Sequence, residues 1–196
     1  MTRIYLVRHG EVYNPKNLCY GRLPRFGLSK TGVKQAEKLH KYFLSKKISK
    51  IYASPLLRSR QTAKIISGGT VPLSFSKKII EIDLRNFQGK DWDFAISTRN
   101  NIKSKGKFPD ETYQHVQDRV VSKIMQIAKR HPNENIVVVM HADPIIAAKL
   151  YFENISIDKL NGQSLANGAM VILNFNSDLK CTKIAYNNIT GSKTDF

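Results

Sequence analysis

An apolar run stops at charged and small residues in the stretch IYLVRHGE, residues 4–11. Its first four residues are β-branched, aromatic or aliphatic and too few for a helix, so they predict a buried β-strand. In an open parallel sheet, ligands bind just beyond the carboxyl ends of the strands, which is where Arg8 and His9 fall. Gly10 allows the backbone to turn sharply or to approach a ligand closely. The alternative is an ordinary surface turn, and three residues alone do not separate the two.

A second stretch repeats this pattern far along the chain. Residues 136–140, IVVVM, form another buried-strand run, and His141 follows directly. Apolar residues recur at helical spacing between the two strands, in 30–45, 55–67 and 111–131. This alternation predicts an α/β fold: a doubly wound, mainly parallel sheet with helices on both faces. Both strand ends then lie at one edge of the sheet, so we expect His9 and His141 to meet there.

Local signals set the expected ends of the other elements. Ser29 is expected to cap the first helix, and Pro55 to open the second, which ends before Gly68. Asp143 is expected to be an N-cap with Pro144 at the first helical position, and a substrate contact of Asp143 stays open. Further strands are expected at 51–54, 71–75, 169–175 and 181–186, with an irregular segment at 79–89.

The size and charge of the chain limit the classes of function. With 196 residues it is expected to form one domain, residues 1–196, with a lid or loop insertion around 90–112. The 32 Lys and Arg residues outnumber 15 Asp and Glu, so the net charge is +17 and anions are attracted. These basic residues are scattered rather than grouped in a tail, so a small anionic phosphorylated substrate is favoured over nucleic acid.

Cysteine spacing and hydropathy argue against other classes. Cys19 and Cys181 have no CxxC spacing, which argues against a zinc site and a disulfide framework. We expect no metal and no cofactor. No stretch approaches the roughly 20 apolar residues of a membrane span. Arg3 and Arg8 interrupt any leader-like run at the N-terminus. A cytoplasmic location without membrane association is therefore the expectation, and the oligomeric state stays open.

Two imidazoles and two guanidiniums in one place suit a phosphate group. Arginine binds a phosphate dianion through paired hydrogen bonds, and Arg8 and Arg58 would supply two such groups. Their charge lowers the pKa of neighbouring histidines, which favours a neutral imidazole able to attack phosphorus. The arginines and the second histidine would stabilise the equatorial oxygens without a metal.

Four motifs in order resemble those of the histidine phosphatase superfamily, the relatives of cofactor-dependent phosphoglycerate mutase. They are RHGE with Asn14, LSKTG at 28–32 with QA at 35–36, SPLLR at 54–58 with QTA at 61–63, and the strand into His141. The likeness spans about residues 3–150. It implies a phosphoglycerate mutase-like fold and His9 as the phosphorylated nucleophile. It also implies that Arg8, Arg58 and His141 bind the phosphoryl group, with Asn14 assisting at the rim.

The leaving alcohol also needs a proton donor with a tuned pKa, and the residues alone leave Glu11, Glu81 and Asp83 as candidates. The family's acid lies in a Leu-x-Glu stretch followed by an aromatic residue and glycines. Residues 80–89, IEIDLRNFQG, resemble that stretch, which implies Glu81 as the acid. Arg85 stands where the family has a glycine.

Substrate contacts are expected beside these motifs. Ala142 replaces the glycine that usually follows the second histidine, and its backbone N–H can still face the phosphate. Gly21 and Arg22 are candidates for substrate contact, with packing of the loop as an equal alternative. The loops at 12–26 and 93–112 are both basic, which leaves a multiply charged phosphate compound open.

The favoured hypothesis is a metal-independent phosphomonoesterase that works through a phosphohistidine at His9, with Glu81 as general acid and base. One alternative is a phosphoglycerate mutase-type phosphomutase, an isomerase, which differs only in the acceptor of the phosphoryl group. The short segment between Gly89 and Glu111 leaves little room for the mutase insertion and favours the phosphatase. The other alternative is a non-catalytic module that binds anions or nucleic acid.

Overall fold

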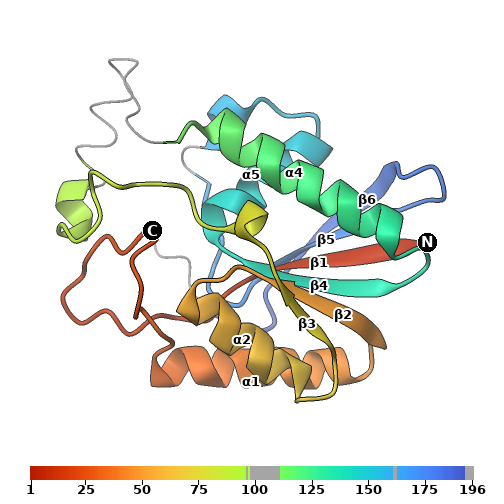
Figure 1. The fold of residues 1–196 in the computed structure, drawn as a ribbon, viewed down its shortest axis with the longest axis horizontal. Coiled ribbons are helices and arrows are strands. Elements are labelled where there is room, and N and C mark those ends of the chain that lie inside the picture. The colour runs from red at the N-terminus through yellow and green to blue at the C-terminus, as the bar shows by residue number, and fades with distance from the viewer. Residues whose placement is uncertain (96, 98–110, 161–162, 193–196) are drawn as a thin grey trace.

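The computed structural model describes residues 1–95, 97, 111–160 and 163–192 (Figure 1). Most of the segment around 90–112, where the sequence predicts a lid or loop insertion, lies outside the described residues.

A six-stranded sheet in the order β3-β2-β4-β1-β5-β6 forms the centre of the described structure. The first four strands in chain order run parallel, whereas β5 is antiparallel to both of its neighbours. The strands are β1 (Thr2–Arg8), β2 (Ile48–Ala53), β3 (Leu73–Phe75), β4 (Asn135–Met140), β5 (Met170–Phe175) and β6 (Cys181–Asn187). The expected mainly parallel α/β fold is confirmed.

Helices connect and cover the strands. They are α1 (Lys30–Leu44), α2 (Leu57–Ser67), α4 (Tyr113–Arg130) and α5 (Ala142–Phe152), with short 3₁₀ turns η1 (Lys77–Ile79) and η2 (Ile157–Leu160). Within the described part of the chain, no helix combines the length and apolarity needed to cross a bilayer.

Helices cover both faces of the sheet (Figure 1), and alternate side chains of β1 pack against opposite faces. Ile4 and Leu6 share one core with residues of α4 and α5. Tyr5 and Val7 share the other core with residues of α1 and α2. Burial of each such side chain stabilises the fold by about 1.5–3 kcal/mol, so β1 is held from both sides.

Two helices begin elsewhere than the sequence predicts. Pro55 lies before α2 rather than in its first turn, because the Ser54 hydroxyl accepts the Leu56 N–H and holds a local turn there. In α5 the N-cap is His141 and not Asp143. Pro144 is tolerated in the first turn because the first N–H groups of a helix have no intrahelical partner.

The strand register brings the ends of three strands to one edge of the sheet. Arg8 on β1 pairs with Met140 on β4, so His9 and His141 occupy equivalent positions beyond the two strands. The backbone N–H of His9 donates to the Met140 carbonyl at 3.1 Å. Ser54, the first residue after β2, donates its N–H to the Val139 carbonyl at 2.9 Å.

Candidate active site

A cavity of about 360 Å³ opens at this edge of the sheet, and its lining includes Arg8, His9, Glu81 and Ala142. The imidazoles of His9 and His141 lie in contact, with ring centroids 5.1 Å apart and an interplanar angle of 64°. The two histidines that are 132 positions apart in the sequence therefore meet, as the two strand ends predict.

His9 presents one unprotonated ring nitrogen. Its Nδ1–H donates to the Gly10 carbonyl at 2.8 Å, so Nε2 carries the lone pair and accepts from Nε of Arg58 at 3.1 Å. Burial, and then the charges of Arg58 and Arg8, hold the pKa of His9 well below its usual value. Gly10 is required beside it, because a Cβ there would lie 2.4 Å from the Gly32 carbonyl oxygen. His9 is therefore a neutral imidazole fixed in one tautomer.

Arg58 lies fully buried on α2, with one donor left over. Its Nη2 donates to the Gly21 carbonyl at 2.7 Å, and its guanidinium stacks 4.8 Å from the ring centroid of Tyr20. Its Nη1 is buried and has no hydrogen-bond partner among the described residues. A buried donor without a hydrogen bond lowers the stability of the fold, which indicates that Nη1 of Arg58 binds an anionic ligand.

His141 is oriented by a serine that follows β2. Oγ of Ser54 accepts the Leu56 N–H and lies 2.8 Å from Nε2 of His141, and we assign the Ser54 hydroxyl as the donor to Nε2. Nδ1 of His141 is then the protonated nitrogen. It is buried without a hydrogen-bond partner among the described residues and lies 3.9 Å from Oε2 of Glu81. Burial, followed by the Arg58 charge, lowers the pKa of His141 well below its usual value.

We expect Ser54→Ala to lower kcat about 10- to 100-fold, because one buried donor no longer selects the His141 tautomer. Ser54→Thr keeps the hydroxyl and should restore most of the activity. Nitrogen NMR of His141 distinguishes this tautomer effect from a packing defect, since it reports which ring nitrogen carries the proton. An unchanged proton distribution in Ser54→Ala would contradict the assigned role.

Glu81 lines the cavity together with His9 and lies beside His141. Its Oε1 accepts the Ile82 N–H at 2.9 Å, and its Oε2 faces His141. Burial, followed by the negative charge of Asp143, raises the pKa of Glu81 to about 7. A carboxyl with this pKa can both give and take a proton near neutrality. Asp83, another candidate acid, pairs with Arg22 and Arg85 instead.

The four residues expected to contact substrate divide into two groups. Asn14, Gly21 and Ala142 line the cavity, although the Asn14 amide also bonds the Leu18 backbone. Arg22 has a different role: its Nε donates to the Glu81 carbonyl at 2.8 Å. Its Nη2 pairs with Glu111 at 2.7 Å. For Arg22 the structure thus supports loop packing.

No pattern in the sequence predicts the ion-pair network that lies behind Glu81. Nε of Arg119 pairs with Glu111 at 2.7 Å, and Nη1 of Arg119 donates to the Ile80 carbonyl at 2.7 Å. Burial alone would raise the pKa of Glu111, but its hydrogen bond to Arg119 holds the pKa below the usual value. The network ties the irregular segment that carries Glu81 to α4.

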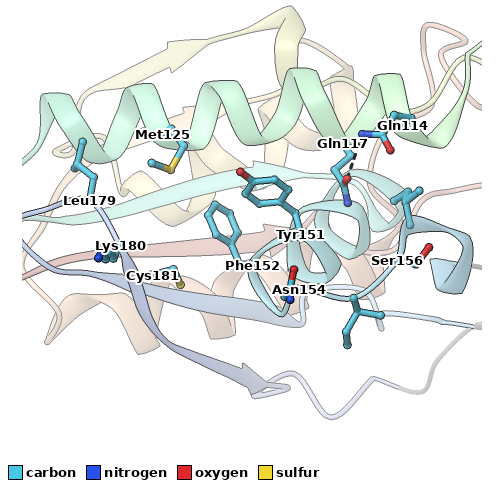
Figure 2. A pocket seen from close by; sticks show the side chains of 12 residues that line it. Gln114, Gln117, Met125, Tyr151, Phe152, Asn154, Ser156, Leu179, Lys180 and Cys181 are labelled. Carbon is cyan, nitrogen blue, oxygen red and sulfur yellow. Dashed lines mark hydrogen bonds between the residues drawn. The ribbon is translucent and has the colours of Figure 1, made fainter.

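A larger hollow of about 670 Å³ (Figure 2) shares no described lining residue with the cavity beside His9. Aromatic and polar side chains line it between α4, the end of α5 and the β5–β6 turn, including Tyr151, Phe152, Gln117 and Lys180. Its described lining holds no histidine, aspartate or glutamate. Among the described residues, no three His, Cys, Asp or Glu side chains are grouped closely enough to hold a metal ion.

Comparisons with known proteins give one family, with phosphatases and a mutase among the relatives: a 2,3-bisphosphoglycerate-dependent phosphoglycerate mutase of Thermoplasma acidophilum is 26% identical over 86% of this chain and 84% of its own length. The family model "Histidine phosphatase superfamily (branch 1)" matches residues 4–188. Phosphoserine phosphatase 1 of Hydrogenobacter thermophilus is 30% identical over 75% of this chain and 74% of its own length. The metal-independent phosphoserine phosphatase of Arabidopsis thaliana is 29% identical over 76% of this chain and 68% of its own length.

Two further matches extend the comparison. An uncharacterized protein of Mycobacterium tuberculosis is 46% identical, but the match spans only 34% of this chain and 33% of that protein. Among solved structures, YhfR of Bacillus stearothermophilus has a TM-score of 0.85 at 23% identity and covers 97% of this chain and 100% of its own. At this identity the likeness shows a shared fold.

Proposed function

The chain is an enzyme that belongs to the histidine phosphatase superfamily (branch 1), and we propose that it is a metal-independent phosphomonoesterase acting on a small phosphorylated metabolite. The observation that carries the proposal is that His9 lines the cavity and is contacted by two buried residues with unused nitrogens: Arg58, whose Nε bonds His9 Nε2, and His141, whose ring lies against that of His9. Relatives named phosphoserine phosphatases support a phosphatase over a mutase.

In the first step, the Nε2 lone pair of His9 attacks phosphorus and the bond to the ester oxygen breaks. The protonated Glu81 carboxyl gives its proton to the leaving alkoxide, so the alcohol departs neutral. In the second step, the Glu81 carboxylate takes a proton from water, whose oxygen attacks phosphorus. The phosphorus–nitrogen bond then breaks, its electron pair returns to Nε2, and inorganic phosphate leaves.

Positive charge and N–H donors stabilise the oxygens of the transferred group. Arg58 offers Nη1, His141 offers Nδ1–H, and Arg8 lines the same cavity. Donors that are already in place need no reorganisation during the reaction, which is the main source of catalysis in phosphoryl transfer. Two guanidiniums supply the charge, so turnover should persist in the presence of a chelator.

The raised pKa of Glu81 predicts a pH dependence of kcat/KM. The acid must be protonated in the free enzyme, so for an alkyl phosphate kcat/KM falls about tenfold per pH unit above a pKa of about 7. Glu81→Gln removes this limb and lowers kcat/KM about 10²- to 10⁴-fold. The loss is much smaller for a nitrophenyl phosphate, whose leaving group needs no proton.

The measurement is a pair of pH profiles, one for each substrate, for wild type, Glu81→Gln and the exposed control Glu37→Gln. Equal losses with both leaving groups in Glu81→Gln would show that Glu81 is not the proton donor.

The direct test of the proposed function is release of inorganic phosphate from an aryl phosphate and from a panel of alkyl phosphates, including phosphoserine, with chelator present. Transfer to water yields free phosphate in step with alcohol. Transfer to a second alcohol without free phosphate would favour the mutase. No turnover on any ester, with binding of nucleic acid that weakens steeply with salt, would favour the binding module.

A further inference from the structure

Features that do not involve its acidic residues identify the cavity as a ligand site: Arg58 and His141 both contact His9, which lines the cavity, and buried Nη1 of Arg58 and Nδ1 of His141 have no hydrogen-bond partner among the described residues. The guanidinium and carboxyl side chains in its described lining are those of Arg8, Glu11, Glu81 and Asp143. The proposed function assigns Arg8 to the phosphoryl group and uses Glu81 in its protonated form for the first step. Beyond the phosphoryl position, the charge of the described lining therefore comes from the carboxylates of Glu11 and Asp143.

The remaining polar lining is neutral. It consists of amides and hydroxyls, from Asn14, Asn17, Tyr20, Gln163, Ser164 and Asn167. The basic residues of the loop at 12–26 lie outside the described lining, and Arg22 is bound to Asp83 and Glu111. In a chain with a net charge of +17, the described part of the wall around the leaving group thus carries acidic and amide side chains.

Two of the carboxylates are fixed by local structure. Asp143 lies in the first turn of α5, immediately after His141 and Ala142. Its negative charge contributes to the raised pKa of Glu81, so the two carboxyl groups interact electrostatically. The Glu11 carboxylate accepts the Ser29 hydroxyl, which caps α1, and Glu11 also lines the cavity.

We propose, on the basis of the proposed function, that this enzyme prefers phosphomonoesters whose alcohol carries an ammonium group and discriminates against those with a second anionic group, with Asp143 as the specificity-determining residue. A second carboxylate or phosphate meets like charge and amides at this wall. An ammonium group meets opposite charge, and a neutral polyol meets hydrogen-bonding partners only.

A matched substrate set tests the proposal. The three esters share a phosphate group and a two-carbon alcohol and differ in the group at the other end. Phosphoethanolamine ends in an ammonium, hydroxyethyl phosphate in a hydroxyl and phosphoglycolate in a carboxylate. We expect kcat/KM to decrease in that order. Asp143→Asn should lower the ratio of kcat/KM for phosphoethanolamine to that for phosphoglycolate about tenfold relative to wild type.

The ratio of kcat/KM for the two substrates is compared between variant and wild type. This comparison cancels the effect of the different basicities of the leaving alcohols, and it cancels any change in the protonation of Glu81 that affects both substrates equally. Asp178→Asn is the control, because it changes the net charge equally at the β5–β6 turn, where Phe175 pairs with Thr2 at the opposite end of β1. Asp143→Ser serves if Asp143→Asn does not fold.

The outcomes separate the two proposals. The highest kcat/KM for phosphoglycolate, or an Asp143→Asn ratio equal to that of Asp178→Asn, overturns the specificity. Turnover of an aryl phosphate with none of the three matched esters cleaved also counts against it. Absence of turnover on every ester instead removes the proposed function.

Discussion

Replacing His9 with alanine removes the nucleophile, and turnover of every phosphate ester is expected to fall about 10⁴-fold or more. The size of the loss follows from the geometry, because the Nε2 lone pair held by Arg58 Nε is the proposed attacking group. The neighbouring imidazole of His141 cannot replace it. Its Nε2 is bonded to Ser54, and its Nδ1 carries the proton.

His115→Ala is the matched control for His9→Ala, since the His115 side chain is mostly exposed on α4 and is not part of the described lining of the cavity. We expect that variant to keep wild-type kcat/KM. Circular dichroism and thermal unfolding establish that His9→Ala is folded. Retained turnover in a folded His9→Ala protein would remove the phosphohistidine mechanism.

Arg58→Met is expected to lower kcat/KM about 10³-fold, because it removes both the donor to His9 and a fixed positive charge beside the phosphoryl group. The variant should also shift the acid limb of the pH profile. Arg58 lowers the pKa of His9 after burial does, so without it the pKa of His9 rises toward its ordinary value. Activity requires neutral His9, and it is therefore lost at a higher pH as the solution is acidified.

Arg60→Met is the control for this variant, because Arg60 lies two positions further along α2 with its guanidinium over the Phe75 ring. Arg58→Lys keeps a charge but not the fork of donors, and its activity is expected to stay well below wild type. Binding of inorganic phosphate, followed by thermal shift, should weaken in Arg58→Met and not in Arg60→Met. Equal phosphate binding in both variants would contradict the role of Arg58.

Much of the fold is readable from local sequence because the strands and helices carry strong periodic signals. The apolar runs before His9 and His141 are β1 and β4, and they lie side by side in parallel register. The Ser29 cap and the Gly68 C-cap lie where the pattern predicts them. Buried strands and capped helices depend on neighbours in sequence, which explains this success.

The parts that sequence analysis missed depend on distant partners. Arg22 is a basic loop residue in the sequence, but its carboxylate partners lie 61 and 89 positions away. Ser54 belongs to a recognisable motif, yet its bond to His141 spans 87 positions. The sequence predicts Asp143 as the N-cap of α5, whereas the N-cap is His141, because an Asp-Pro pair is as compatible with the first turn as with the cap position.

Phosphorus is expected to become bonded to His9 during turnover. Glu81→Gln with an aryl phosphate tests it most directly, because the first step needs no acid with that leaving group while the second step lacks its base. After an alkaline quench, peptide mapping by mass spectrometry should locate one phosphate on His9, stable in alkali and lost in acid. Phosphate on another residue, or continued phosphate release with His9 unmodified throughout, would contradict the account.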